Sequence, residues 1–258
     1  MRKRTRTALA VPALSLAAAL AVAGPAAAAD TTQGELSPVP LNGADASGTA
    51  MVWVDGTTLT VEFEAEGLLA DSPHAAHIHY AGAARHECPA ASDDADGDGT
   101  ITTTEGGPAY GSVQVSLTTE GDTSPDSALA VDRFDAASGG DITYQRGSIE
   151  VTQEVADALA DGEAAVVVHG VDYDGDGMYG GDKMSDLDPS LPAEATDPAL
   201  CGIMTVSQMA EMPEGGVQTG SGSTAGVENV GLIAGGAAAL IAGGALLVRT
   251  RRSARAER

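Results

Sequence analysis

The five histidines of this 258-residue chain fall in or near segments that alternate like β-strands. His77 and His79 are two residues apart in PHAAHIHY, and residues two apart lie on the same face of a strand. The two imidazoles can therefore bind one ion, and His169 in VVVHG is the candidate for a third ligand from another strand. A site of imidazoles alone suits copper or zinc, and copper has the higher affinity. An exposed strand edge without a metal is the alternative for the HxH pair.

The acidic segment DADGDGTITTTE, residues 94–105, is a second group with recognisable chemistry. It follows the calcium-loop template, with acids at positions 1, 3, 5 and 12 and a glycine at position 6. The segments on both sides are poor in helix-forming residues, so we expect a calcium loop between strands and not between helices. A solvated acidic turn is the alternative. The candidate calcium ligands are Asp94, Asp96, Asp98 and Glu105.

The same D-x-D-x-D-G start recurs directly after His169, in Asp172, Asp174 and Asp176. Position 12 of this second segment is Lys183, and the nearest acid is Asp182. It is therefore a weaker calcium candidate than the first segment. Because both loops adjoin histidine strands, an ion in either loop could order the rim of the histidine site.

Six segments have the composition or the alternation of strands, and turn residues separate them. In one of them, Leu59, Val61 and Phe63 alternate with polar residues, as in a half-buried strand. Residues 151–160 have helical spacing and predict one short helix or turn. The chain is therefore predicted to be mostly β. The six segments are TAMVWV, TTLTVEFEAE, HAAHIHY, GSVQVSLTT, DITYQRGSIEV and EAAVVVHGV.

Several strings resemble the copper/zinc superoxide dismutases over about residues 48–205. GLLADSPHAAHIHYAGAARHEC is similar to the family's first copper strand. In that family a disulfide cysteine follows this strand, at the same spacing as Cys88 follows His79. VVVHGVDYDGDG is similar to a second copper segment, and ALCGIM to the segment that carries the other cysteine. The chain also resembles bacterial secreted proteins with a CHRD (chordin-type) domain of related β architecture, in HxxHxH, the acidic loop, PAYG and LDPSLPAEATDPALCG.

This resemblance implies an all-β fold, a Greek-key β-sandwich or barrel like that of superoxide dismutase. It implies further that His77, His79 and His169 bind copper, that His74 is structural, and that Cys88 and Cys201 form a disulfide. The chain departs from the dismutase pattern in two places. No histidine lies between Cys88 and His169, where that family has its bridging histidine and zinc ligands, and Pro198 stands where it has a guiding arginine.

The two ends of the chain predict export and anchoring. A cationic start and an apolar run predict a signal peptide over residues 1–29. Residues 230–248 are uncharged and long enough to form a transmembrane helix, and the basic tail 249–258 would stay in the cytoplasm. Residues 211–229 predict a flexible spacer. Within it, Thr219 and Gly220 resemble a sortase cleavage site, so attachment to the cell wall and to the membrane both stay open.

Between these ends lie an N-terminal segment, residues 30–47, and the β domain, residues 48–210. The formal net charge of the chain is −24, and only Arg85, Arg133, Arg146 and Lys183 among its basic residues lie between the ends. Such a domain repels nucleic acid and attracts cations. In an exported chain, two cysteines most simply form one disulfide, and a thiolate metal site is the alternative.

The sequence thus predicts a secreted domain, displayed at the cell surface, with metal ions and the cell membrane or cell wall as its partners; it names no protein partner. The leading function is an extracellular, envelope-anchored metal-binding domain with a copper-type site of three histidines and a calcium loop. One alternative is a copper-only enzyme related to superoxide dismutase. Another is a calcium-stabilised surface or adhesion module whose histidines are structural.

Overall fold

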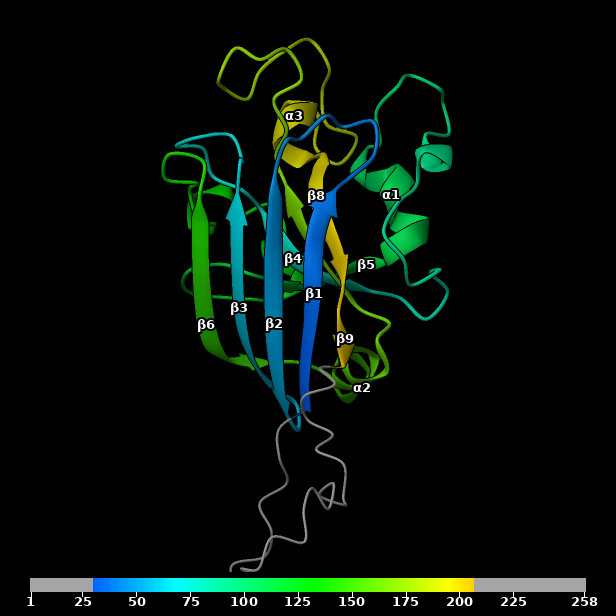
Figure 1. Ribbon diagram of the computed structural model, residues 1–258, viewed down its shortest axis with the longest axis vertical. Coiled ribbons are helices and arrows are strands. Elements are labelled where there is room, and N and C mark those ends of the chain that lie inside the picture. The colour runs from blue at the N-terminus through cyan, green and yellow to red at the C-terminus, as the bar shows by residue number, and fades with distance from the viewer. Residues whose placement is uncertain (1–29, 207–258) are drawn as a thin grey trace, which may run out of the picture. The chain divides into compact units, whose positions relative to one another are not determined.

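The computed structural model describes residues 30–206 (Figure 1). The predictions for residues 1–29, 211–229, 230–248 and 249–258, including Thr219 and Gly220, lie outside this range. Within it, no helix is long and apolar enough to cross a membrane. The strands are β1 (Asp30–Pro38), β2 (Ser47–Asp55), β3 (Thr58–Glu66), β4 (Ala76–Tyr80), β5 (Ser112–Ser116), β6 (Ile142–Glu150), β7 (Ala165–His169), β8 (Pro198–Ile203) and β9 (Thr205–Val206). The α-helices are α1 (Thr103–Tyr110), α2 (Gln153–Asp161) and α3 (Ala193–Thr196), and the 3-10 helices are η1 (Ala91–Asp93), η2 (Pro125–Ser127) and η3 (Val131–Arg133).

The strands form one antiparallel sheet in the order β5-β4-β7-β8-β1-β2-β3-β6, and β9 pairs with β1. Figure 1 shows β6, β3, β2 and β1 in front, with β4 and β5 behind them. The sheet curls so that its two halves share one core, in which Val61 and Phe63 of β3 belong to the same cluster as Ile78 of β4 and Val166 of β7. The prediction of a mostly β fold is confirmed.

All six predicted strand segments form strands, β2 to β7. The predicted alternation in β3 is confirmed, because Leu59, Val61 and Phe63 are buried and the residues between them are more exposed. Residues 153–161 form α2, which begins at the Thr152 cap and ends at Gly162 in the left-handed conformation.

The strands β1, β8 and β9 were not predicted, and residues 30–47 contribute the first of them to the sheet. The segment of β1, DTTQGELSP, has few apolar residues and a glycine, which is weak evidence for a strand. The structure explains Gly34, because a Cβ atom at this position would lie 2.7 Å from the carbonyl oxygen of Ile203.

The helix α1 corrects the expectation that the first acidic loop lies between strands, since the helix begins inside that loop. Its sequence, TTEGGPAY, contains two glycines and a proline, which disfavour helix. A capping box between Thr102 and Glu105 starts the helix, and it is buried on one side through Ala109 and Tyr110. Local capping and burial outweigh the poor helix propensity.

Cys88 and Cys201 form a disulfide, with 1.98 Å between the sulfur atoms. Cys201 lies on β8, paired with Ser37 of β1 and with Val167 of β7. The disulfide therefore fastens the loop after β4 to the middle of the sheet.

Candidate metal centre

The three histidines predicted as ligands lie on neighbouring strands. His77 and His79 are on β4, which pairs with β7, and His169 is the last residue of β7. Along these strands, Ile78 and Val168 point into the main core, so the histidines lie on the opposite face of the sheet. That face is also covered, and each histidine is no more than 3% exposed.

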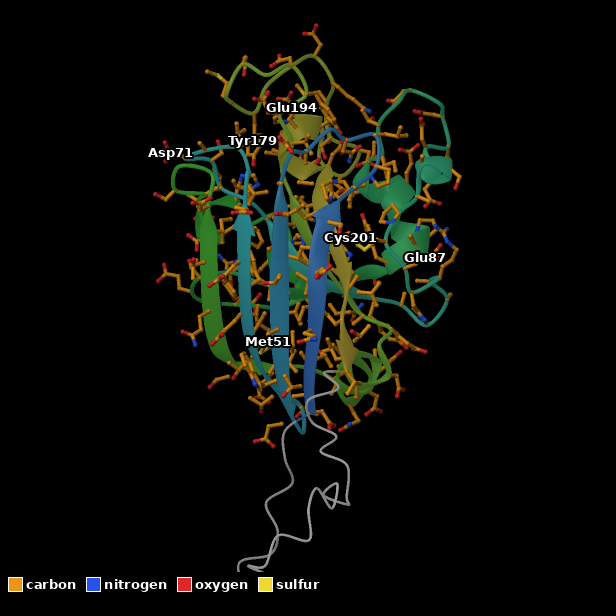
Figure 2. The ribbon with its side chains drawn as sticks, in the orientation of Figure 1. Met51, Asp71, Glu87, Tyr179, Glu194 and Cys201 are labelled. Carbon is orange, nitrogen blue, oxygen red and sulfur yellow. A yellow bond between two sulfur atoms is a disulfide. The ribbon has the colours of Figure 1, made fainter. Side chains whose placement is uncertain are left out.

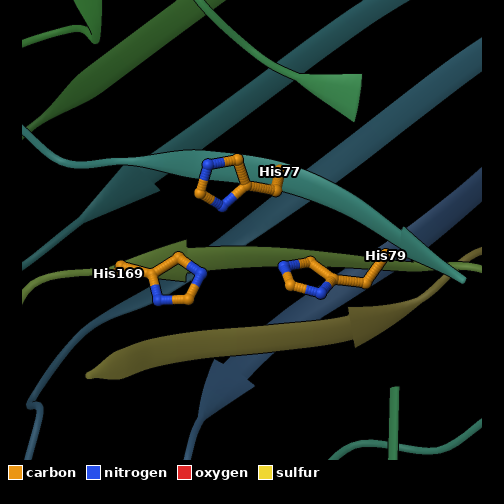
Figure 3. Close-up of side chains that lie close together, drawn as sticks. All are labelled: His77, His79 and His169. Atoms are coloured by element: carbon orange, nitrogen blue, oxygen red, sulfur yellow. The ribbon is translucent and has the colours of Figure 1, made fainter. Parts of the chain in front are cut away.

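The three imidazole rings converge (Figure 3). Their centroids are 5.0 Å apart for His77 and His169, 5.6 Å for His77 and His79, and 5.9 Å for His79 and His169. One nitrogen atom from each ring lies within 4.8 Å of the other two. In a trigonal site with metal–nitrogen bonds of about 2.0 Å, the nitrogens are about 3.5 Å apart, so small ring movements would close the site around an ion.

Each ring has one nitrogen bonded to the backbone and one nitrogen left over. The bonded nitrogen of each ring faces a carbonyl oxygen, so it carries the hydrogen and donates it. The other nitrogen is buried and has no hydrogen-bond partner within residues 30–206. The bonds are His77 Nε2 to Ala128 O (3.0 Å), His79 Nδ1 to Gly111 O (3.0 Å) and His169 Nδ1 to Thr196 O (2.6 Å), and the unpaired atoms are His77 Nδ1, His79 Nε2 and His169 Nε2.

The three carbonyl groups come from the ends of short helical segments. Ala128 closes η2, Gly111 ends α1 with a φ of 91°, and Thr196 is the last residue of α3. The hydroxyl of Thr103, at the start of α1, also donates to Thr196 O at 2.6 Å. The segments that cover the histidines therefore also set the orientation of their rings.

Burial keeps the three imidazoles neutral. It lowers the pKa of His79 to about 3 and that of His169 to about 4. The pKa of His77 lies well below its usual value because of burial and, secondarily, because the other two imidazoles are close. Three neutral rings, each with one unpaired nitrogen, are a donor set that suits a copper or zinc ion.

His74 lies outside this group of three and contacts the backbone beside it. Its Nδ1 is 2.8 Å from the carbonyl oxygen of His169, and its Nε2 is 3.1 Å from that of Leu69. The hydroxyl of Tyr179 is 3.1 Å from His74 Nδ1. Gly170 makes this packing possible, because a Cβ atom there would lie 2.0 Å from the Tyr179 hydroxyl oxygen. His74 and Tyr179 thus connect the second acidic loop to the end of β7.

The first acidic loop brings together carboxylate oxygens of Asp94, Asp96 and Glu105 within 4.8 Å of one another. Glu105 accepts a hydrogen bond from the backbone N–H of Ala95 at 2.9 Å, so the acid at position 12 closes the loop over position 2. Asp98 does not join this group, because it forms an ion pair with Lys183 of the second loop at 2.5 Å.

In the second loop, Glu194 takes the place of the acid that position 12 lacks. Asp172, Asp174 and Glu194 have carboxylate oxygens within 4.8 Å of one another, whereas Asp176 accepts a hydrogen bond from the Met178 backbone. Glu194 accepts from the backbone of Tyr173, at position 2, as Glu105 does in the first loop. In Figure 2, Glu194 and Tyr179 lie at the end of the molecule that carries α3.

Three further residues of the site, Glu194, Tyr179 and Thr103, were not predicted from the sequence. The only sign of Glu194 is the absence of an acid at position 12 of its loop, because the residue itself follows in a separate segment, LPAEAT. Both Glu194 and Thr196 belong to α3, so one turn of helix contacts the second acidic loop and the ring of His169.

The fold and the site together define a class of protein: a curled antiparallel β domain with three buried histidines and two acidic loops. The family model that matches it is the CHRD domain, over residues 27–177, and the chain belongs to this family. The matched range holds all three histidines and the first acidic loop, and it ends before Glu194 and Cys201. The comparison with curated proteins found no match.

Proposed function

We propose that this chain is an extracellular metal-binding domain whose three histidines, His77, His79 and His169, bind copper. The observation that carries the proposal is the set of three buried nitrogens without a hydrogen-bond partner, one on each ring. A buried polar atom without a partner costs on the order of 1–3 kcal/mol, and a bound metal ion would remove that cost at all three positions. Copper is favoured over zinc by its affinity for imidazole nitrogen.

A second part of the proposal is that the acidic loops bind calcium. Asp94, Asp96 and Glu105 supply hard oxygens in a loop of the appropriate spacing, and Asp172, Asp174 and Glu194 repeat the arrangement. The first loop is the stronger candidate, because its acids all fall on the template.

Export of the domain is also a proposal, with residues 1–29 as its signal and residues 230–248 or Thr219 as its means of attachment. The disulfide between Cys88 and Cys201 supports it, because such bonds persist in oxidising compartments outside the cytoplasm. We also propose that the domain has a Greek-key arrangement related to that of superoxide dismutase. The curled antiparallel sheet supports this proposal.

Metal analysis of the purified full chain tests the copper site. The chain should retain about one equivalent of copper after dialysis, and His77→Ala and His169→Ala should each weaken copper binding by more than about 100-fold. His86→Asn is the matched control, because His86 lies outside the group of three and has a positive φ of 56°, which Asn tolerates.

If the wild-type chain retains neither copper nor zinc, the histidines are structural, and a stabilising effect of calcium would then favour the surface or adhesion module. An equal loss of copper in His86→Asn would also count against the site. Superoxide turnover well above that of free copper in the same buffer would favour the enzymatic alternative.

A further inference from the structure

A small cavity lies directly against the three-histidine centre. Its volume is about 40 Å³, and the rings of His77 and His169 form part of its wall. The remaining wall is mostly apolar, and none of the described residues that line it is charged. A cavity of this size has room for a molecule of only a few atoms. The apolar side chains that line it are Ala75, Val113, Ala128, Leu129, Val131, Leu187, Leu191 and Ala195.

Three large apolar side chains form the outer side of this cavity. Leu129 is 39% exposed, Val131 is 38% exposed and Leu187 is 46% exposed, so each contacts both solvent and the cavity. Leu129 and Leu187 also line a wider groove of about 700 Å³ that reaches His79. The solvent side of the cavity is therefore formed by exposed apolar side chains.

The charged residues next to these apolar side chains in the sequence are predominantly acidic. Leu187 lies between Asp186 and Asp188, and Val131 precedes Asp132. The nearby cation, Arg133, donates hydrogen bonds to Asp122 O and to Ser127 Oγ. An anion that approaches the histidines would thus meet negative charge first and then an apolar wall that cannot solvate it.

We propose that this apolar cavity is the ligand site of a metal ion that His77, His79 and His169 would hold, and that it admits small neutral molecules and disfavours anions. The inference rests on the proposed function, since it needs the metal ion to be bound. It deepens that function by assigning the class of ligand, a neutral molecule of two or three atoms such as dioxygen or carbon monoxide. Superoxide, an anion, would be a poor ligand for this site.

Two probes test the inference on the copper-loaded full chain. After reduction with ascorbate without oxygen, carbon monoxide should give one infrared carbonyl band, absent from His77→Ala. In the oxidised form, azide should bind weakly, as followed by the visible and electron paramagnetic resonance spectra. Leu129→Arg places a cation at the cavity and should tighten azide binding by about tenfold.

Val206→Arg is the matched control, because Val206 is 49% exposed on β9 and does not line the cavity. It should bind azide as the wild type does. Leu187→Arg, on a different segment, serves as a second test should Leu129→Arg fail to fold. The inference is overturned if the wild type binds azide as tightly as Leu129→Arg and Leu187→Arg do. It is also overturned if copper stays bound and carbon monoxide gives no infrared band. A wild-type chain that retains no copper would overturn the proposed function, and this inference with it.

Discussion

The backbone hydrogen bonds of three imidazoles decide which nitrogen of each ring can bind a metal ion. His77 offers Nδ1, whereas His79 and His169 offer Nε2, because the other nitrogen of each ring donates to a carbonyl oxygen. The ring orientations therefore exist before any ion binds. A preorganised donor set loses little conformational entropy on binding, which favours high affinity.

The same burial makes the metal-free protein sensitive to acid. The unfolded imidazoles have a pKa of 6.5, and those of His79 and His169 fall to about 3 and about 4 in the folded state. As the pH falls below 6.5, the unfolded chain binds protons that the folded chain does not. Each buried imidazole then lowers the free energy of unfolding by up to about 1.4 kcal/mol per pH unit.

Asp197 has the opposite effect on the free energy of unfolding. Burial raises its pKa to about 7, so as the pH falls the folded carboxyl group binds a proton before the unfolded one does. For the three imidazoles of the centre and this carboxyl group together, the free energy of unfolding falls by about 2–3 kcal/mol per pH unit between about pH 6 and 4.5, and His74, whose pKa burial also lowers, adds to the decrease. Urea denaturation at several pH values measures this slope. His79→Gln should reduce the slope by the contribution of about one imidazole. A flat profile in the wild type would refute the prediction.

The residues of the centre differ in how far they could be predicted. His77 and His79 share a strand face, so the period of two places their rings together without knowledge of the fold. His169 required a resemblance or a guess about strand pairing. Glu194 was out of reach, because its contact with Asp172 depends on how the chain between them returns to the sheet.

At the scale of elements, α3 connects the second acidic loop with the histidine centre. Glu194 in this turn of helix accepts hydrogen bonds from the loop backbone at Tyr173 and Gly180, and Thr196 accepts the hydrogen bond from His169. The two loops also contact each other through the ion pair of Lys183 and Asp98. An ion in either loop would therefore fix elements that orient the histidines.

Calcium should stabilise the domain through these loops. At a free calcium concentration 100 times the dissociation constant, one site adds about 2.7 kcal/mol to the free energy of unfolding. For a domain of this size, that corresponds to a rise in Tm of several degrees, about 2–4 °C per kcal/mol. Differential scanning calorimetry with calcium and with a chelator measures the effect.

Glu105→Gln should remove most of this calcium-dependent rise, whereas Glu64→Gln, an exposed acid on β3 outside both clusters, should retain it. Equal melting temperatures with calcium and with chelator in the wild type would show that the loops do not bind calcium under these conditions.

The elements themselves follow from the sequence where their signals are local. Apolar alternation located β3, and the Thr152 and Gly162 caps delimit α2. Two of the elements that were not predicted are β1, which forms through its pairing with β2, β8 and β9, and α1, whose cap outweighs its glycines and proline. In both cases, tertiary contacts or a single cap decide against intrinsic propensity.

For the molecule as a whole, the disulfide is a covalent constraint that joins the loop after β4 to β8. Its cysteines are separated by 113 residues, and in the chain-entropy model closing a loop of about 100 residues contributes about 4.7 kcal/mol to stability. Replacing both Cys88 and Cys201 by Ala should lower the free energy of unfolding by about 3–5 kcal/mol. Urea denaturation measures the change, and the reduced wild type is the comparison. An unchanged midpoint would mean that the reduced, unfolded chain is itself compact.

The pairing of β1 with β9 has a mechanical consequence. Thr32 faces Val206, so the two ends of the described chain lie on adjacent strands, and a force that pulls on both ends would act first on this pair. The closed loop between Cys88 and Cys201 cannot be drawn out while the bond is intact. At about 3.5 Å per residue, this withholds roughly 400 Å of contour length from a stretched molecule. The oxidised domain would therefore extend only a short way under load, and reduction of the disulfide would increase the contour length of the described chain by a factor of about 2.8.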